Sequence, residues 1–315
     1  MKFGASSWPF QWDPPYEDTI RRVGSLGFKA IELIAWNTEF LTEVYTAPKI
    51  AELKKVLAGE GVALSQFVMS PHDLASPDAA KRKQAIEMFR RAVDVGVALG
   101  SPIINSVACW PFGNARAFPR ITTKPLVQTF AAAFPGNLDW DQNYKDYVEA
   151  LHTCGEICKD AKVWYSLEPH PFSYMANALG ALRLLEHADS SAIGINFDPS
   201  HTFPIGDFPN VSVYQLGKHI KHVHASDNDG VTNVHWRPGR GKIDWKQFLQ
   251  ALKDVGYDGV ISIELEDVPG VSRGANLEAP GLFRNKIATD EFVAETVAGA
   301  DYLKGICKEI GIRVE

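Results

Sequence analysis

The chain has 315 residues, of which 45% are hydrophobic and 22% are charged, and its formal net charge is −6. This composition supplies a large buried core and excludes wholesale disorder, and the negative charge argues against nonspecific nucleic-acid binding, which needs clustered Lys and Arg. The N-terminus lacks the apolar core of a signal peptide, and no segment approaches the roughly 20 apolar residues of a membrane span. We therefore expect a soluble cytoplasmic protein that binds neither nucleic acid nor a membrane.

Short β-branched runs alternate with longer amphipathic segments, a pattern typical of repeated βα units with parallel strands. The predicted strands lie at 3–8, 30–36, 63–70, 102–109, 163–170, 193–199, 220–226 and 259–266, and the predicted helices at 14–26, 48–60, 78–99, 137–160, 177–188, 209–218, 244–256 and 290–311. Gly61 and Gly100 stand where helices should stop. Eight strand-helix pairs predict an α/β fold, the (β/α)8 TIM barrel. Because no linker separates two regimes of composition, we expect residues 1–315 to form a single domain.

Three predicted loops are longer than usual: 110–136 after strand 4, 227–243 after strand 7 and 267–289 after strand 8. Long loops in a compact domain tend to be lids or binding loops, and these follow strands, on the face where TIM barrels keep their active sites. The first loop is aromatic, with Trp110 and Phe112 at its start. It has three open interpretations: it caps an apolar ligand, contacts another subunit of a homo-oligomer, or folds onto itself.

Residues that bind metals end four successive strands, the fifth to the eighth. Side chains two apart share one face of a strand, so most candidates come as same-facing pairs, while Asp198 stands alone after the sixth strand. The pairs are Glu168 and His170, His222 and His224, and Glu264 and Glu266. A single strand-end carboxylate is about as often a cap or an ion-pair partner. Burying three carboxylates at one barrel mouth, however, is costly without a cation, so the sequence predicts a divalent metal there.

A set of three carboxylates and one imidazole is hard and rich in oxygen. Such a set suits Mn²⁺, Mg²⁺ or Co²⁺, whereas structural zinc usually occupies sites rich in thiolates. We rank Mn²⁺ first, ahead of Mg²⁺, Co²⁺ and Zn²⁺, because the nitrogen ligand weighs against Mg²⁺. No G-x-G-x-x-G follows a strand, so a dinucleotide cofactor is not indicated. The four cysteines have neither zinc-finger nor redox spacing, and we expect them to be reduced and structural.

The motifs at these strand ends resemble those of the sugar phosphate isomerase/epimerase superfamily, whose members have a xylose-isomerase-like barrel. The similar segments are SLEPH, FDPSH, HVHASDN, PGRGKIDW and ISIELED, and the similarity runs from Phe3 to about Gly311. The resemblance implies four metal ligands and one substrate neighbour: Glu168, Asp198, His224 and Glu264, with His201 near the substrate. It also selects His224 over His222, a choice that strand parity leaves open.

The resemblance also implies a reaction. In the ketose 3-epimerases that this chain resembles, the first and last glutamate ligands are the two acid/base groups, which here are Glu168 and Glu264. A divalent ion stabilises the enediolate that forms when a sugar α-proton leaves, and carboxylates on opposite sides of the carbon can remove and return that proton. We therefore expect an enzyme, a divalent-metal-dependent isomerase or epimerase that acts on a keto sugar or a related polyol.

The chain differs from the ketose 3-epimerases at two positions. Those enzymes hold substrate hydroxyls with a glutamate shortly after the first ligand and an arginine shortly after the histidine ligand, where this chain has Tyr174 and Gly230. The candidates for substrate contact are His170, Arg237, His72 and Trp110, with Arg240 and Lys242 less favoured. Each charged or imidazole candidate also has an ordinary interpretation, as surface charge for Lys and Arg and as strand-end hydrogen bonding for the histidines.

Other functions are alternatives. A lyase, either a dehydratase or a deglycosidase, would act on a 3-keto sugar or an oxidised glycoside by the same enolisation, and Trp110, Phe112 and Trp236 would suit a bulky aglycone. A hydrolase that cleaves abasic DNA is disfavoured for two reasons: the chain is acidic, and that chemistry uses a cluster of several metals that needs more histidines. A noncatalytic sugar-binding module or a metal-free structural barrel would need no cation.

Overall fold

The computed structural model describes residues 1–111, 139–266 and 289–315. Within these ranges, eight parallel strands close into a barrel, in which each strand pairs with the next and β8 pairs back with β1. The strands are β1 (Lys2–Ser6), β2 (Ala30–Ile34), β3 (Ala63–Val68), β4 (Ile103–Val107), β5 (Trp164–Glu168), β6 (Ile193–Phe197), β7 (Ile220–Ala225) and β8 (Val260–Ile263). The predicted TIM barrel is confirmed. The predicted strands run one to three residues too far at their carboxyl ends, where the chain leaves the sheet to line the barrel mouth.

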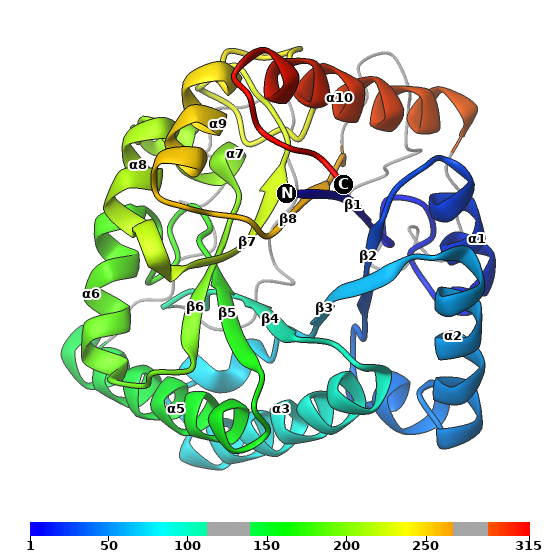
Figure 1. Cartoon of the computed structure of the whole chain (residues 1–315). Coiled ribbons are helices and arrows are strands. Elements are labelled where there is room, and N and C mark those ends of the chain that lie inside the picture. Colours follow the sequence, from blue (N-terminus) through cyan, green and yellow to red (C-terminus); the bar gives the residue numbers. More distant parts are fainter. Residues whose placement is uncertain (112–138, 267–288) are drawn as a thin grey trace.

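Helices surround the strands as an outer ring, which Figure 1 shows in a view along the barrel axis. The longer ones are α1 (Glu17–Ser25), α2 (Ala47–Glu60), α3 (Ala79–Leu99), α5 (Trp140–Asp160), α6 (Ala178–Ala188), α8 (Pro209–Leu216), α9 (Trp245–Asp254) and α10 (Asp290–Glu309). Each matches a predicted helix to within three residues at either end. The predicted stops at Gly61 and Gly100 are confirmed, since both glycines cap their helices with a positive φ.

Short helical segments were not predicted, because they are too brief to show a periodic pattern. They are the π-helix η1 (Phe40–Val44), the 3₁₀ turns η2 (His72–Ala75), η4 (Phe203–Ile205) and η5 (Gly217–His219), and α7 (Pro199–Thr202). Two of them matter for the barrel mouth, since η2 follows β3 and α7 follows β6.

The outer face of the strands is apolar and packs against the helices. Phe67 of β3 and Ile104 of β4 are fully buried where α3 covers them. Gly96 lets α3 lie this close, because a Cβ at that position would come within 2.3 Å of Ile104 Cδ1. A side chain there would force the helix away from the sheet.

The inner face of the barrel is polar, although TIM barrels are usually filled by branched apolar side chains. Each strand contributes one buried residue to a ring that we call the polar layer: Ser6, Glu32, Gln66, Asn105, Ser166, Asn196, His222 and Ser262. Alternate residues of a strand face the same way, so the residues two positions further along also point inward. In β5 to β8 those next residues are the predicted metal ligands, which places the polar layer directly below them.

The long loop 227–243 is held by Asp227. The backbone of Asp227 pairs with that of Trp236 in an antiparallel bridge. Its carboxylate accepts hydrogen bonds from the backbone N–H groups of Gly239 and Ile243 and from the indole of Trp245, at 2.9 to 3.1 Å. The loop is therefore a fixed part of the barrel mouth.

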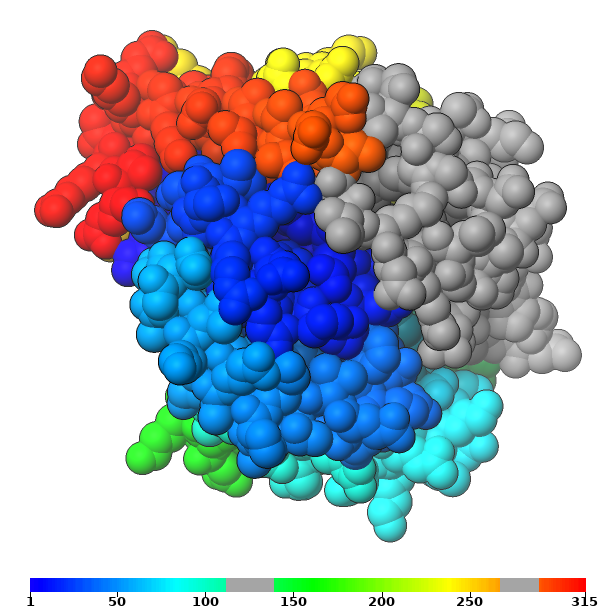
Figure 2. All heavy atoms as spheres, turned by 90° about the vertical axis from the view of Figure 1, so that its right-hand side faces the viewer, coloured from blue at the N-terminus to red at the C-terminus, as the bar shows by residue number. Residues whose placement is uncertain are grey.

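Helices α10, α1 and α2 lie side by side on the surface that Figure 2 shows, and Arg22 of α1 reaches Asp290 of α10 at 3.5 Å. None of the helices in the described ranges combines the length and apolar character that a membrane span requires. The four cysteines are free and buried. The long loops predicted at 110–136 and 267–289 fall almost entirely outside the described residues.

Candidate metal centre

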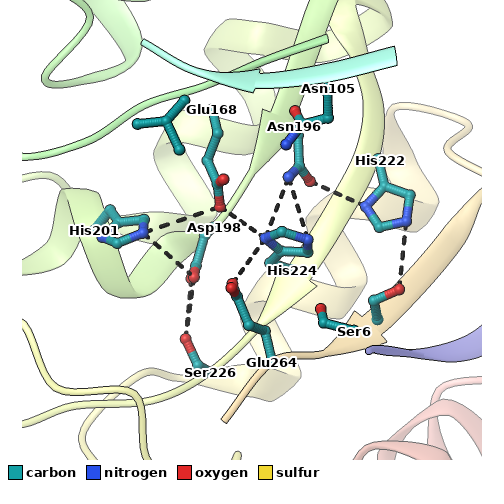
Figure 3. Close-up of polar contacts among 12 residues, drawn as sticks. Ser6, Asn105, Glu168, Asn196, Asp198, His201, His222, His224, Ser226 and Glu264 are labelled. Carbon is teal, nitrogen blue, oxygen red and sulfur yellow. Dashed lines mark hydrogen bonds and ion pairs between the residues drawn. The ribbon is translucent and has the colours of Figure 1, made fainter. Parts of the chain in front are cut away.

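Four side chains from consecutive strands gather at the barrel mouth. Glu168 ends β5, His224 lies in β7, and Asp198 and Glu264 directly follow β6 and β8. All four are buried, and one ligand atom from each lies within 4.8 Å of the others. Figure 3 shows the carboxylates of Glu168 and Glu264 at the same end of the His224 ring, one above and one below in this view. The structure thus brings together the four ligands that the sequence analysis predicted.

His224 stands at the centre of this cluster. Its Nδ1 lies 2.7 Å from Glu168 Oε1 and 2.9 Å from Glu264 Oε2. Its Nε2 lies 2.9 Å from Glu32 Oε2, a residue of the polar layer. The two ring nitrogens therefore have different surroundings, because Nδ1 faces the cluster and Nε2 faces the layer beneath it.

Asp198 is fixed by the start of α7. Its Oδ1 accepts a hydrogen bond from the backbone N–H of Ser200 at 2.8 Å, and Ser226 Oγ donates to its Oδ2 at 3.1 Å. Pro199 follows as the first helical residue, where its fixed φ favours the turn out of the strand. The local sequence therefore ends the strand at Asp198 and holds its carboxylate at the mouth.

Trp8, just beyond β1, holds Glu264. Its indole N–H donates to Glu264 Oε1 at 2.8 Å, and its ring packs edge-on against Trp36 at 6.5 Å between centroids. This hydrogen bond leaves Glu264 Oε2 turned toward His224. Trp8 was not predicted, because its contact links the residues that follow the first and last strands and depends on the pairing of β1 with β8. Its one signal was its position at the end of the first predicted strand.

The ionisable groups of the cluster shift one another strongly. Burial raises the pKa of Glu168 to about 7, and the charges of Glu264 and Glu32 add to the shift. Burial also raises the pKa of Asp198 well above its ordinary value. Burial opposes protonation of His224, but the surrounding carboxylates outweigh it and raise the pKa of this imidazole well above its ordinary value. Added positive charge therefore stabilises the cluster, whether it comes from bound protons or from a cation.

The donor set fits a divalent metal ion. Atoms that share an ion at about 2.1 Å lie roughly 3 to 4 Å apart, so small side-chain movements would bring the four groups onto one cation. Three carboxylates and one imidazole are hard ligands, and no cysteine belongs to the cluster. Glu168, Asp198, His224 and Glu264 are thus the residues that could hold such an ion.

Cation binding is expected to weaken as the pH falls from about 8 to about 6. Since the pKa of Glu168 is raised to about 7, a proton occupies this ligand at lower pH and the cation must displace it. The dissociation constant for Mn²⁺ should then rise by about tenfold per pH unit for each displaced proton. Calorimetric titration in buffers of different ionisation enthalpy measures both the affinity and the protons released. An affinity independent of pH, with no proton released, would contradict this prediction.

A histidine group adjoins the cluster. His201 Nε2 lies 4.0 Å from both Glu168 Oε1 and Asp198 Oδ2, and its Nδ1 lies 3.0 Å from Asn233 Oδ1. His235, from the loop 227–243, lies 3.6 Å from Asp198 Oδ2 and packs against His201 at 4.6 Å between ring centroids. His201 was predicted as a neighbour of the substrate, whereas His235 was not predicted, because it follows no strand.

An aromatic row leads outward from His201. Its ring lies 3.6 Å from that of His170, which is followed by Trp110 at 5.6 Å and His72 at a further 5.7 Å, all between centroids. The indole N–H of Trp110 donates to the carbonyl of Pro171 at 2.9 Å, which fixes the middle of the row. Three of the predicted substrate-contact residues therefore form one row of rings that starts beside His201.

Arg237 is directed elsewhere. Its Nε lies 3.1 Å from Glu295 Oε2 on α10, and Arg240 binds the same carboxylate at 2.5 Å. The structure does not bring Arg237 to the cluster, and the ion pair agrees with the ordinary interpretation of this residue as a surface charge.

Comparison with known proteins decides the family. The family model of the xylose isomerase-like TIM barrel matches residues 20–286. The chain belongs to this family. The resemblance inferred from the strand-end motifs is thereby confirmed, and the matched region contains all four residues of the cluster.

Relatives of stated activity include sugar 3-epimerases and an inosose dehydratase of Clostridium tetani, which is 24% identical over 146 residues that cover 41% of this chain and 49% of that protein. The D-psicose 3-epimerase of Ruminiclostridium cellulolyticum is 24% identical over 289 residues, which cover 88% of this chain and 88% of that protein. The fructoselysine 3-epimerase of Shigella flexneri is 20% identical over 258 residues, covering 80% and 85%. A solved structure of D-psicose 3-epimerase with D-tagatose, from Clostridium cellulolyticum H10, has a TM-score of 0.74 at 23% identity, covering 97% of this chain and 99% of that one. This last similarity concerns the fold.

Proposed function

We propose that this chain is a divalent-metal-dependent isomerase or epimerase of a keto sugar or a related polyol, with Mn²⁺ as the first choice of ion. The proposed ligands are Glu168, Asp198, His224 and Glu264. The observation that carries the proposal is the burial of two glutamates on either side of one candidate cation site at the barrel mouth. The similarity to a D-psicose 3-epimerase and a fructoselysine 3-epimerase supports the choice of a keto sugar.

Glu168 and Glu264 are the proposed acid/base pair. They come from β5 and β8, and each has an oxygen within 2.9 Å of the same nitrogen of His224. A sugar carbon held between them presents one face to each carboxylate. One glutamate can then take a proton from the first face while the other delivers a proton to the opposite face, which inverts the carbon. The bound ion would stabilise the negative charge that develops on the substrate oxygens.

His201 is proposed to bind a substrate hydroxyl. Burial lowers the pKa of this imidazole to about 4, so the ring is neutral at physiological pH. Because Nδ1 donates its proton to Asn233 Oδ1, the lone pair of Nε2 is left facing the space beside Glu168 and Asp198. A sugar hydroxyl there can donate a hydrogen bond to it.

Solvent deuterium tests the proposal. Keto sugars are incubated with the Mn²⁺-loaded protein in D₂O and followed by NMR. We expect a new epimer to form, with deuterium at the inverted carbon, because the returned proton comes from a carboxylate that exchanges with solvent. A protein that binds Mn²⁺ and yet exchanges no carbon-bound proton of any keto sugar or 3-keto glycoside would refute the proposed chemistry.

A lyase is the second candidate function, and two positions of the chain favour it. The ketose 3-epimerases hold hydroxyls where this chain has Tyr174 and Gly230. The hydroxyl of Tyr174 accepts a hydrogen bond from Asn143 Nδ2 at 2.6 Å, and the ring of Tyr174 stacks on Tyr147. The side chain of Tyr174 is therefore directed toward α5. Gly230 has no side chain, and Phe203 lies beside it. Neither residue can hold the substrate as a glutamate or an arginine would.

The aromatic row supports the same alternative. His170, Trp110 and His72 form a row of rings that starts beside His201, and such a row suits a ring-bearing leaving group better than it suits a free ketose. A 3-keto glycoside with a coloured phenolic aglycone distinguishes the two functions. A lyase releases the phenol, whereas an epimerase returns the intact glycoside with deuterium at the inverted carbon.

A further inference from the structure

One carboxylate of the polar layer has no part in the proposed function. Glu32 of β2 is fully buried, although β2 supplies none of the proposed ligands. A buried carboxylate is costly unless hydrogen bonds and an opposite charge compensate for it, and three other carboxylates nearby add repulsion. Its place in the barrel therefore needs an explanation in terms of what it contacts.

Glu32 contacts the central histidine. Glu32 Oε2 lies 2.9 Å from His224 Nε2, a contact between residues 192 positions apart in the sequence. The other nitrogen, Nδ1, faces Glu168 and Glu264, so it is the atom that would reach a shared cation. When Nδ1 is the ligand, the neutral ring carries its proton on Nε2 and donates it to Glu32.

Neighbouring side chains hold Glu32 in this position. Ser6 Oγ donates to its Oε1 at 3.1 Å, and Gln66 Nε2 donates to its Oε2 at 2.5 Å. Both donors stand opposite Glu32 in the register of the flanking strands β1 and β3. Gln66 Nε2 also lies 3.2 Å from His224 Nε2, but an amide nitrogen has only hydrogens to donate. Glu32 is thus the group that can accept the imidazole proton.

We propose that Glu32 is a positioning residue, which fixes the ring orientation and tautomer of His224 so that Nδ1 is presented to the cation. This role rests on the proposed cation site. Metal-bound histidines usually donate their second N–H to a carboxylate or carbonyl, and loss of that partner weakens metal binding by about 10- to 100-fold. The competing explanation is that Glu32 is itself a ligand, because Glu32, His222 and His224 also have ligand atoms within 4.8 Å of one another.

Titration of the metal-free full chain with Mn²⁺, with free Mn²⁺ measured by EPR, tests the role. Glu32→Ala is expected to weaken binding by about 10- to 100-fold, with one ion bound per chain. Glu32→Gln should weaken it less, because its amide oxygen can still accept the Nε2 proton. The matched control is Asn105→Ala, in the same layer, whose Oδ1 accepts a hydrogen bond from Ser166 Oγ at 2.9 Å. It should leave the affinity unchanged.

Each other outcome overturns the proposal in a distinguishable way. Unchanged Mn²⁺ affinity in a folded Glu32→Ala variant removes the role of Glu32 alone. Two ions bound by the wild type and one by this variant make Glu32 a ligand instead. No binding by the wild type removes the cation site itself. If Glu32→Ala fails to fold, ¹⁵N NMR of the Zn²⁺-loaded wild type decides the question, since His224 should carry its proton on Nε2. The opposite tautomer overturns the proposal.

Discussion

Glu168→Gln and Glu264→Gln are each expected to lower the turnover of a keto sugar by about 10²- to 10⁴-fold while the barrel stays folded. Glutamine keeps the volume and one ligating oxygen, but it cannot accept a proton. Both glutamates are buried, so no water can take over the proton transfer without rearrangement. Turnover should be measured at saturating Mn²⁺, which separates the loss of an acid/base group from the loss of metal affinity.

The two-base arrangement adds a sharper expectation for the same pair. Each variant keeps the carboxylate that serves one face of the carbon. It should therefore still exchange deuterium into one epimer without inverting it, and the two variants should label opposite epimers. The control is Glu17→Gln, which removes a buried carboxylate that pairs with Lys49 outside the barrel. Near wild-type turnover in either site variant would refute the assignment.

Removal of divalent cations with a chelator is expected to abolish turnover, and Mn²⁺ to restore it. Without a cation, buried carboxylates at the barrel mouth repel one another, and protons cannot replace the Lewis acid that the reaction needs. An ion at a hundred times its dissociation constant stabilises the folded state by about 2.7 kcal/mol, which raises the melting temperature by several degrees. Activity and thermal unfolding are followed while Mn²⁺, Co²⁺, Mg²⁺ or Zn²⁺ is added back.

Asp198→Asn is the control for this experiment. It keeps a side chain that can accept the hydrogen bonds of Ser200 and Ser226 but removes one ligand charge. The variant should fold without added metal and show a smaller thermal shift with Mn²⁺. Full activity of a chelated protein whose elemental analysis shows no divalent metal would exclude metal dependence.

The barrel and the strand-end positions of the cluster could be predicted because each depends on local sequence, whereas the choice of His224 over His222 came from the family resemblance. Alternating runs mark the strands, and carboxyl ends of parallel strands always meet at one edge, so residues such as Glu168 and Glu264 converge in any barrel with this order. The Pro199 turn similarly marks the end of a strand. Strand ends were predicted slightly too long, since residues such as Asp198 keep an extended backbone after the pairing with the next strand has stopped.

The supporting residues could not be predicted in the same way. Glu32 and Trp8 act across the barrel, on partners that β7 and β8 carry, and their contacts follow from the register in which the strands close. Within its strand, Glu32 is simply a charged residue in an apolar run. His235 lies on a loop whose path depends on the hydrogen bonds of Asp227. None of these positions has a local pattern that sets it apart.

Translation delivers the proposed ligands only in the second half of the chain, from Glu168 to Glu264. Trp8 and Glu32, which contact two of them, leave the ribosome with the first two strands, whereas Glu264 follows the last strand. A growing chain therefore carries the supports long before it has all four ligands. Binding of the proposed cation would then await the joining of β8 to β1, so a nascent chain stalled before that point would carry an incomplete candidate site.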